Sequence, residues 1–200
     1  DGQKVPPKSL INSLNYFLVA SAIARNKDLK APFTYLCHPD SSTKEHERYR
    51  NWIAEYFDDL SEMLYSQNGE SKVLEHVDFN NLINQITAKI GFPDLSAWSQ
   101  IQDELIRVIE KVPRISIINK DNKISEIKGF WEQSRIHIII GAMSIERGFT
   151  VEGLMVTYLS RNPGTNADNI QQRARFCGYK SNDHLNLSRL WLDEGNLNFY

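Results

Sequence analysis

Two nearly continuous apolar runs, RIHIII at residues 135–140 and LMVTYLS at 154–160, constrain the fold of this chain more than any other feature. A strand that is apolar on both faces must be covered on both faces, which is typical of a parallel sheet between layers of helices. Shorter β-rich segments occur at 33–38, 114–119 and 187–192. We therefore predict an α/β fold with a parallel sheet flanked by helices.

Helical patterns account for most of the remaining sequence. Residues 9–26 repeat apolar side chains near a 3.6-residue period, which predicts a long, mostly buried helix before the first strand. After that strand, Ser42 and Glu45 have the spacing of a capping box at the start of a second helix. Two further helical patterns follow over 70–112 without a strand signal. We therefore expect one domain over residues 1–200, with a helical insertion at about 44–112.

The composition limits where this chain acts and what it binds alone. Lys and Arg total 23 against 25 for Asp and Glu, so the net charge of -2 does not provide the basic surface of a stand-alone nucleic-acid binder. No apolar run reaches the roughly 18 residues of a membrane span, and the polar start is no signal peptide. Cys37 and Cys177 lack metal-ligand spacing and favour free buried thiols. We expect a cytoplasmic segment of a longer polypeptide, without membrane contact.

Glycine and arginine residues follow two of the predicted strands. The segment IIIGAMSIERGFT covers residues 138–150, and the loop RNPGTNADN leads into a predicted helix NIQQRARFCGYK. Ligands of parallel sheets collect beyond the carboxyl ends of the strands. Taken alone, the first segment is a buried strand and the second a solvated helix face. Their order and shared sheet edge favour a binding site for a polyanion, and phosphate is the usual partner of guanidinium groups.

These segments resemble known motifs. IHIIIGAMSIERGFTVEGL resembles the motif V region of superfamily-two helicases, and QQRARFCGYK resembles their motif VI. The combination also resembles the Z1 domain, a family linked to endonucleases, which typically reads S-R-G-L-T-L-E-G-L and then Q-M-G-R-W-F-G-Y-R. The segments PPKSLINSLNYFLVASAIAR and FTYLCHPD are similar to the opening helix and first strand of that family. The resemblance covers most of the chain.

The resemblance implies the second RecA-like lobe of a helicase-type ATPase of the restriction or defence type. ATP and Mg²⁺ would be held mainly by an N-terminal ATPase lobe of the same polypeptide, with no tight binding by this chain itself. Arg175 would then be an arginine finger for the γ-phosphoryl group, and Arg147 would couple the nucleotide cleft to the nucleic-acid groove. The implied cofactor-binding residues are Gly148, Thr150, Gln171 and Gln172.

The resemblance also implies a nucleic-acid partner, with DNA favoured over RNA. The end of the first strand contacts nucleic-acid phosphates in related helicases, so His38, Ser41 and Ser42 are the predicted contacts. Simple capping of the following helix by Ser42 is the alternative.

Several sequence signals of other activities are missing. No G-x-x-x-x-G-K-[ST] phosphate loop and no Asp-Glu pair after a strand occurs, so a complete ATPase is excluded. The pairs Pro39-Asp40 and Pro93-Asp94 lack a following acid-x-Lys, and the histidines show no metal-binding spacing, so no metal site is predicted. Two alternatives to the motor lobe stay open. They are an inert scaffold that keeps the fold, and a metal-dependent nuclease.

Overall fold

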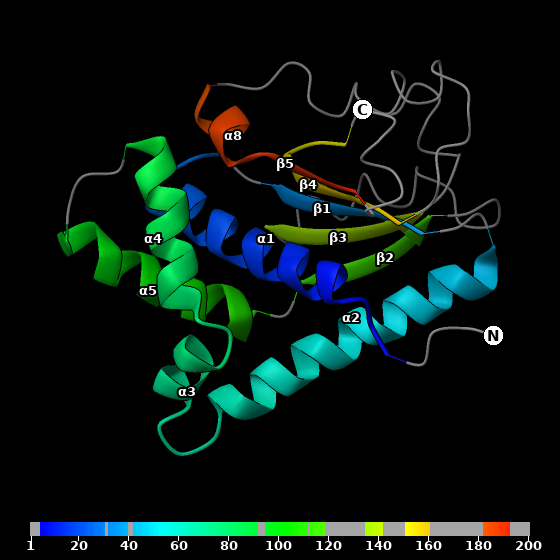
Figure 1. Ribbon diagram of the computed structural model, residues 1–200, viewed down its shortest axis with the longest axis horizontal. Coiled ribbons are helices and arrows are strands. Elements are labelled where there is room, and N and C mark those ends of the chain that lie inside the picture. Colours follow the sequence, from blue (N-terminus) through cyan, green and yellow to red (C-terminus); the bar gives the residue numbers. More distant parts are fainter. Residues whose placement is uncertain are drawn as a thin grey trace.

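The computed structural model is built around a single five-stranded sheet (Figure 1). It describes residues 5–30, 32–39, 42–91, 95–111, 113–118, 135–141, 151–160 and 182–192. All strand pairs are parallel, in the order β2-β3-β1-β4-β5. The strands are β1 Phe33–His38, β2 Arg114–Ile118, β3 Ile136–Gly141, β4 Leu154–Leu159 and β5 Arg189–Leu192. The predicted α/β fold with a parallel sheet is confirmed.

Both faces of the three central strands β1, β3 and β4 are buried, as the apolar runs predict. Tyr35 and Ile138 point to one face and have no exposed surface, while Leu36 and Ile139 point to the other face and are at most 1% exposed. The chain therefore buries its three central strands completely, and they can act as a rigid base for the segments that follow them.

Six described helices accompany the sheet. They are α1 Lys8–Asn26, α2 Thr43–Leu64, α3 Gly69–His76, α4 Phe79–Ile90, α5 Leu95–Glu110 and α8 Asn182–Leu187. None of them is long and apolar enough to cross a membrane. The predicted long first helix and the helical insertion before β2 are confirmed. α8 was not predicted, because its sequence is too short to show a helical period, and it shortens the predicted strand at 187–192 to β5.

The insertion has one helix more than its pattern indicates. Two helical patterns were predicted over 70–112, whereas the structure has α3, α4 and α5 there. The extra break lies at Asp78, whose backbone adopts the left-handed conformation with φ 50°. Its carboxylate accepts a hydrogen bond from the Asn81 N–H at 3.4 Å and so caps α4. Apolar spacing continues through this break, which is why periodicity alone did not reveal it.

Hydroxyl pairs attach α1 to the sheet. The Ser13 and Tyr35 hydroxyls lie 2.7 Å apart, and those of Ser9 and Tyr158 lie 2.9 Å apart. The Phe17 ring packs against the Tyr35 ring with centroids 5.5 Å apart. Burial raises the pKa of Tyr35 well above its ordinary value, so its hydroxyl stays protonated. These pairs fix how α1 is rotated against the strands.

The other long helices pack beside α1 on this face of the sheet. The Tyr56 hydroxyl of α2 donates a hydrogen bond to Asn15 Oδ1 of α1. The Tyr49 ring of α2 lies 6.3 Å from the Tyr158 ring of β4. At the far end of α1, Arg25 Nε lies 2.6 Å from a carboxylate oxygen of Glu104 on α5. α1 is therefore held by contacts along its whole length.

Backbone contacts tie the amino ends of the central strands together. The Phe33 N–H donates to the Arg135 carbonyl, and the Thr34 N–H donates to the Gly153 carbonyl, both at 2.8 Å. The Thr34 hydroxyl adds a 2.7 Å bond to the Glu152 carbonyl. Gly153 has φ +61°, and a Cβ there would lie 1.6 Å from the Pro32 oxygen. Only glycine fits this close approach.

Candidate functional site at the carboxyl edge of the sheet

The strand order brings three strand ends together. β1 lies between β3 and β4, with Cys37 opposite Ile140 on one side and His38 opposite Leu159 on the other. Gly141 at the end of β3 and Ser160 after β4 therefore flank the end of β1. Because all strands are parallel, the segments that leave these three strands start from one edge of the sheet (Figure 1).

His38 joins two of these strand ends through its backbone. Its carbonyl oxygen accepts a hydrogen bond from the Ser160 N–H at 3.2 Å and a longer one from the Ser160 hydroxyl at 3.5 Å. The side chain is only 4% exposed, so the imidazole lies inside the molecule rather than on its surface. Its predicted contact with nucleic-acid phosphates stays a prediction.

Ser42 begins the helix next to this edge. Its hydroxyl accepts a hydrogen bond from the Glu45 N–H at 3.1 Å, which confirms the predicted helix cap. Ser42 is exposed, and the first turn of α2 therefore presents amide donors and the positive end of the helix dipole beside the strand ends. Ser41, the other predicted phosphate contact on this turn, lies outside the described residues.

Sequence reasoning missed one buried polar residue on α2. His46 is 1% exposed, and neither of its ring nitrogens has a hydrogen-bond partner among the described residues. It lies one helical turn from Ser42. Nothing in the sequence separated His46 from an exposed helix histidine, because its neighbours Lys44, Glu45 and Glu47 are charged.

The residues with predicted catalytic and nucleotide roles are Arg147, Gly148, Thr150, Gln171, Gln172 and Arg175, and all of them lie outside the described residues. The structure describes where their segments leave the sheet. Gly141 immediately precedes the segment that contains Arg147, and Ser160 immediately precedes the segment that leads to Arg175. Both departure points adjoin β1. Their roles stay predictions.

Within the described residues, this edge has neither a reactive thiol nor a cluster of metal ligands. Cys37, next to His38, is a free and fully buried thiol, as predicted. Burial raises its pKa well above the ordinary value, so it is not a reactive thiolate. Within the described part of the chain, no group of three or more His, Cys, Asp or Glu side chains is placed to hold a metal ion. Cys177 lies outside that part.

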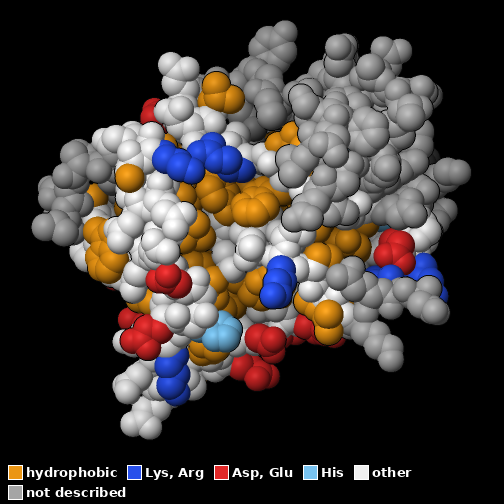
Figure 2. All heavy atoms as spheres, viewed as in Figure 1, with side chains coloured by type: hydrophobic (Ala, Val, Ile, Leu, Met, Phe, Trp, Pro, Cys, Tyr) orange, Lys and Arg blue, Asp and Glu red, His pale blue; other side chains and the backbone are white. Residues whose placement is uncertain are grey.

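The visible surface carries both signs of charge. Figure 2 shows Lys and Arg side chains at several places on the face formed by the helices, with Asp and Glu side chains between them. Among the described residues on this face the two signs are interspersed, and they form no continuous basic stripe of the kind that binds nucleic-acid backbones. This face therefore agrees with the net charge of -2.

The sequence profile of the Z1 domain matches residues 9–200, which include every described strand and nearly all of α1. The chain belongs to the Z1 domain family. The match also includes both segments on which the resemblance rested, so the resemblance is confirmed at the level of the family. Searches of curated proteins and of solved structures return no significant match to this Z1 domain.

Proposed function

We propose that this Z1 domain is the second RecA-like lobe of an ATP-dependent nucleic-acid motor. One observation carries the proposal. β1 lies between β3 and β4, so the two motif-bearing segments leave the sheet on either side of one strand end. Convergence of loops at the carboxyl edge of a parallel sheet is the arrangement in which such folds bind phosphate groups.

In this proposal the domain completes a nucleotide site that another lobe supplies. ATP and Mg²⁺ are held mainly by an N-terminal ATPase lobe of the same polypeptide. Arg175 acts as the arginine finger that stabilises charge on the γ-phosphoryl group, and Arg147 couples the cleft to the nucleic-acid groove. The nucleotide is also contacted by Gly148, Thr150, Gln171 and Gln172. The fully buried strands beneath these segments support the proposal, because a finger must be held rigidly to act.

The nucleic acid in this proposal is DNA, bound beside the amino end of α2. The exposed Ser42 and the amides of the first helical turn suit a backbone phosphate. If the polypeptide also cuts DNA, as the link of the family to endonucleases suggests, we place the nuclease residues outside this chain. Within the described residues no cluster of candidate metal ligands supports cleavage here.

The proposal is tested by measuring ATP hydrolysis by the full-length protein with single-stranded DNA, double-stranded DNA, RNA or no nucleic acid. We expect ATP turnover that DNA stimulates. If a folded full-length protein hydrolyses no ATP under any of these conditions, the domain is a scaffold that retains the motor fold. DNA cleavage by residues 1–200 alone with a divalent metal would favour the nuclease alternative instead.

A further inference from the structure

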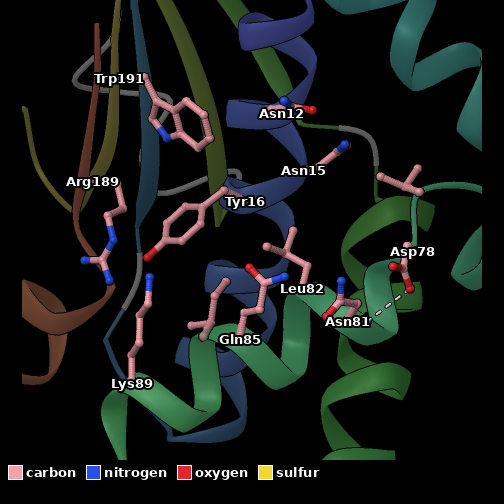
Figure 3. A pocket seen from close by; sticks show the side chains of 12 residues that line it. Asn12, Asn15, Tyr16, Asp78, Asn81, Leu82, Gln85, Lys89, Arg189 and Trp191 are labelled. Carbon is pink, nitrogen blue, oxygen red and sulfur yellow. Dashed lines mark hydrogen bonds between the residues drawn. The ribbon is translucent and has the colours of Figure 1, made fainter. Parts of the chain in front are cut away.

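A hollow on the helical face of the molecule has no role in the proposed motor. It lies between α1, α4 and β5 and has a volume of about 460 Å³, which is within the range of small-molecule sites. Figure 3 shows α1 along its floor, α4 on one side and β5 on the other. None of the strand-end residues His38, Gly141 and Ser160 lines it. It is therefore separate from the carboxyl-edge site.

Two cations lie at one end of this hollow. In Figure 3, Lys89 of α4 and Arg189 of β5 both lie near the hydroxyl end of Tyr16. Arg189 is held in place, because its Nη1 donates to the carbonyls of Asn186 and Ser188 at 3.1 and 2.7 Å, and its guanidinium lies 5.4 Å from the Tyr16 ring centroid. Within the described residues, neither Lys89 nor Arg189 forms an ion pair. This end of the hollow therefore suits an anionic group.

Side-chain amides line the middle of the hollow. They are those of Asn12, Asn15, Asn81 and Gln85. A primary amide carries two donors and an acceptor, so it pairs with both kinds of group on the edge of a nucleobase. Asn15 is oriented by the hydrogen bond that its Oδ1 accepts from Tyr56, which leaves its amide N–H₂ as a donor. Among the described residues of the lining, the only carboxylate is that of Asp78, and it already caps α4.

Apolar groups complete the lining. Leu82 and Ile86 of α4 lie opposite Tyr16 and Trp191, whose rings meet edge to face with centroids 6.4 Å apart. Figure 2 shows apolar side chains visible at the surface beneath neighbouring Lys and Arg side chains on this face. The ring of a base and the carbon atoms of a ribose would bury apolar surface against such a lining.

We propose that this hollow binds a nucleoside monophosphate. Its phosphate lies between Lys89 and Arg189, and its base pairs with the side-chain amides. None of the described residues that line the hollow has a predicted role at the ATP cleft of the proposed motor. Occupation of the hollow would link α4 of the helical insertion to the edge strand β5.

Isothermal titration calorimetry of the full-length protein tests this proposal with AMP, CMP, GMP and UMP as probes. We expect at least one to bind with a dissociation constant below about 1 mM. Lys89→Gln should weaken that binding by about fivefold or more, because Lys89 is an exposed side chain that contributes one of two charges. The matched control is Lys111→Gln, which removes the same charge from an exposed position outside the lining and should leave affinity unchanged.

One further variant and two further ligands test what the hollow recognises. Gln85→Trp should abolish binding by filling the hollow, with the melting temperature unchanged because Gln85 is exposed. Equal affinity of wild type and Lys89→Gln would overturn the proposal. Binding of inorganic phosphate, or of the uncharged nucleoside, as tight as that of the monophosphate would overturn it as well.

Discussion

The two ends of the same strands differ in how they are held. At the amino end, Phe33 and Thr34 are bonded to the chain segments before β3 and β4 by two backbone bonds and one side-chain bond, and Gly153 packs directly on Pro32. At the carboxyl end, the Ser160 N–H and hydroxyl beyond β4 donate hydrogen bonds to the His38 carbonyl of β1. The amino end is thus fastened by close backbone contacts, whereas the carboxyl end is where the motif-bearing segments leave the sheet.

This difference indicates a division of labour along each strand. Substitutions at the amino end should change the free energy of unfolding and leave the activity of each folded molecule intact. Substitutions beyond the carboxyl end should do the reverse, because loops at that edge carry binding groups on a rigid base. Each of the following predictions tests one side of this division.

The largest effect is expected beyond the carboxyl end. In the full-length protein, Arg175→Ala should lower the ATP turnover rate by roughly 10³-fold and leave ATP binding mostly intact, because a finger acts on charge that develops in the transition state. Arg175→Lys should recover little, since lysine lacks the planar fork. Steady-state ATPase assays measure both. The control is Arg50→Ala, which removes an exposed arginine of α2 paired with Glu47 and should leave ATP turnover unchanged. Near wild-type turnover by Arg175→Ala would contradict the assignment of Arg175 as the arginine finger.

The largest effect on stability is expected at the amino end. Gly153→Ala would place a Cβ 1.6 Å from the Pro32 carbonyl oxygen. The backbone there must move, and we expect a loss of about 3 kcal/mol or more in the free energy of unfolding. Urea denaturation followed by circular dichroism measures it.

Gly91 provides a matched control for this substitution. It has φ +68°, similar to Gly153, but a Cβ there would have no atom within 4 Å. Gly91→Ala should therefore cost only the conformational strain of about 1 kcal/mol. Equal losses for Gly91→Ala and Gly153→Ala would show that strand packing at Pro32 does not fasten the amino end.

A smaller effect separates capping from phosphate binding at Ser42. Ser42→Asp keeps an N-cap acceptor for the Glu45 N–H, so the melting temperature should be retained. Its negative charge should lower DNA affinity by about threefold to tenfold at low salt, if a phosphate binds there. Ser42→Ala should instead cost about 1 kcal/mol of stability. Fluorescence anisotropy with labelled DNA measures the DNA affinity of both variants. Unchanged affinity of Ser42→Asp would exclude a phosphate at this position.

The smallest effect concerns the pH dependence of the ion pair between Arg25 of α1 and Glu104 of α5. Burial alone would raise the pKa of Glu104, but hydrogen bonds from Arg25 and Arg107 outweigh it, and the pKa lies below the ordinary value. The contribution of Glu104 to stability is therefore fully present above its unfolded pKa of about 4.3 and is lost as the pH falls through the lower folded pKa. We expect about 1 kcal/mol.

Glu104→Gln is the variant that tests this dependence. It should reduce the difference in unfolding free energy between pH 7 and pH 3 by about 1 kcal/mol. Urea denaturation at both pH values measures this difference. An unchanged difference would show that the pair with Arg25 does not stabilise the joint between α1 and α5.

The fold was largely predictable because its signals are local. The runs at β3 and β4 are apolar at successive positions, and this property alone requires cover on both faces. The break at Asp78 was not predictable in this way, since a left-handed aspartate leaves the apolar spacing intact. Nor was the burial of His46, which depends on how α2 lies on the sheet rather than on its own neighbours.

The two candidate sites also differ in whether their signals are local in the sequence. The motif segments at the carboxyl edge are contiguous in sequence, so a resemblance could identify them before the strand order was known. The hollow on the helical face combines Tyr16, Lys89 and Arg189, which are far apart in the chain. For Asn12 and Asn15 the sequence predicts a mostly buried helix, and the resemblance assigns them no site role. Such a site becomes visible only when packing brings its elements together.

The central position of β1 also determines when the sheet can form during synthesis. Both neighbours of β1 are encoded about a hundred residues later, since Phe33 pairs with Ile136 and Thr34 with Leu154. A nascent chain that has emerged from the ribosome as far as α5 therefore contains the apolar strand β1 without either of its partner strands. α1 and the helices of the insertion can cover one face of that strand through short-range contacts, but its two edges stay open until β3 and β4 emerge. Slow translation between α5 and β4 would therefore prolong the interval in which this protein is most prone to aggregate.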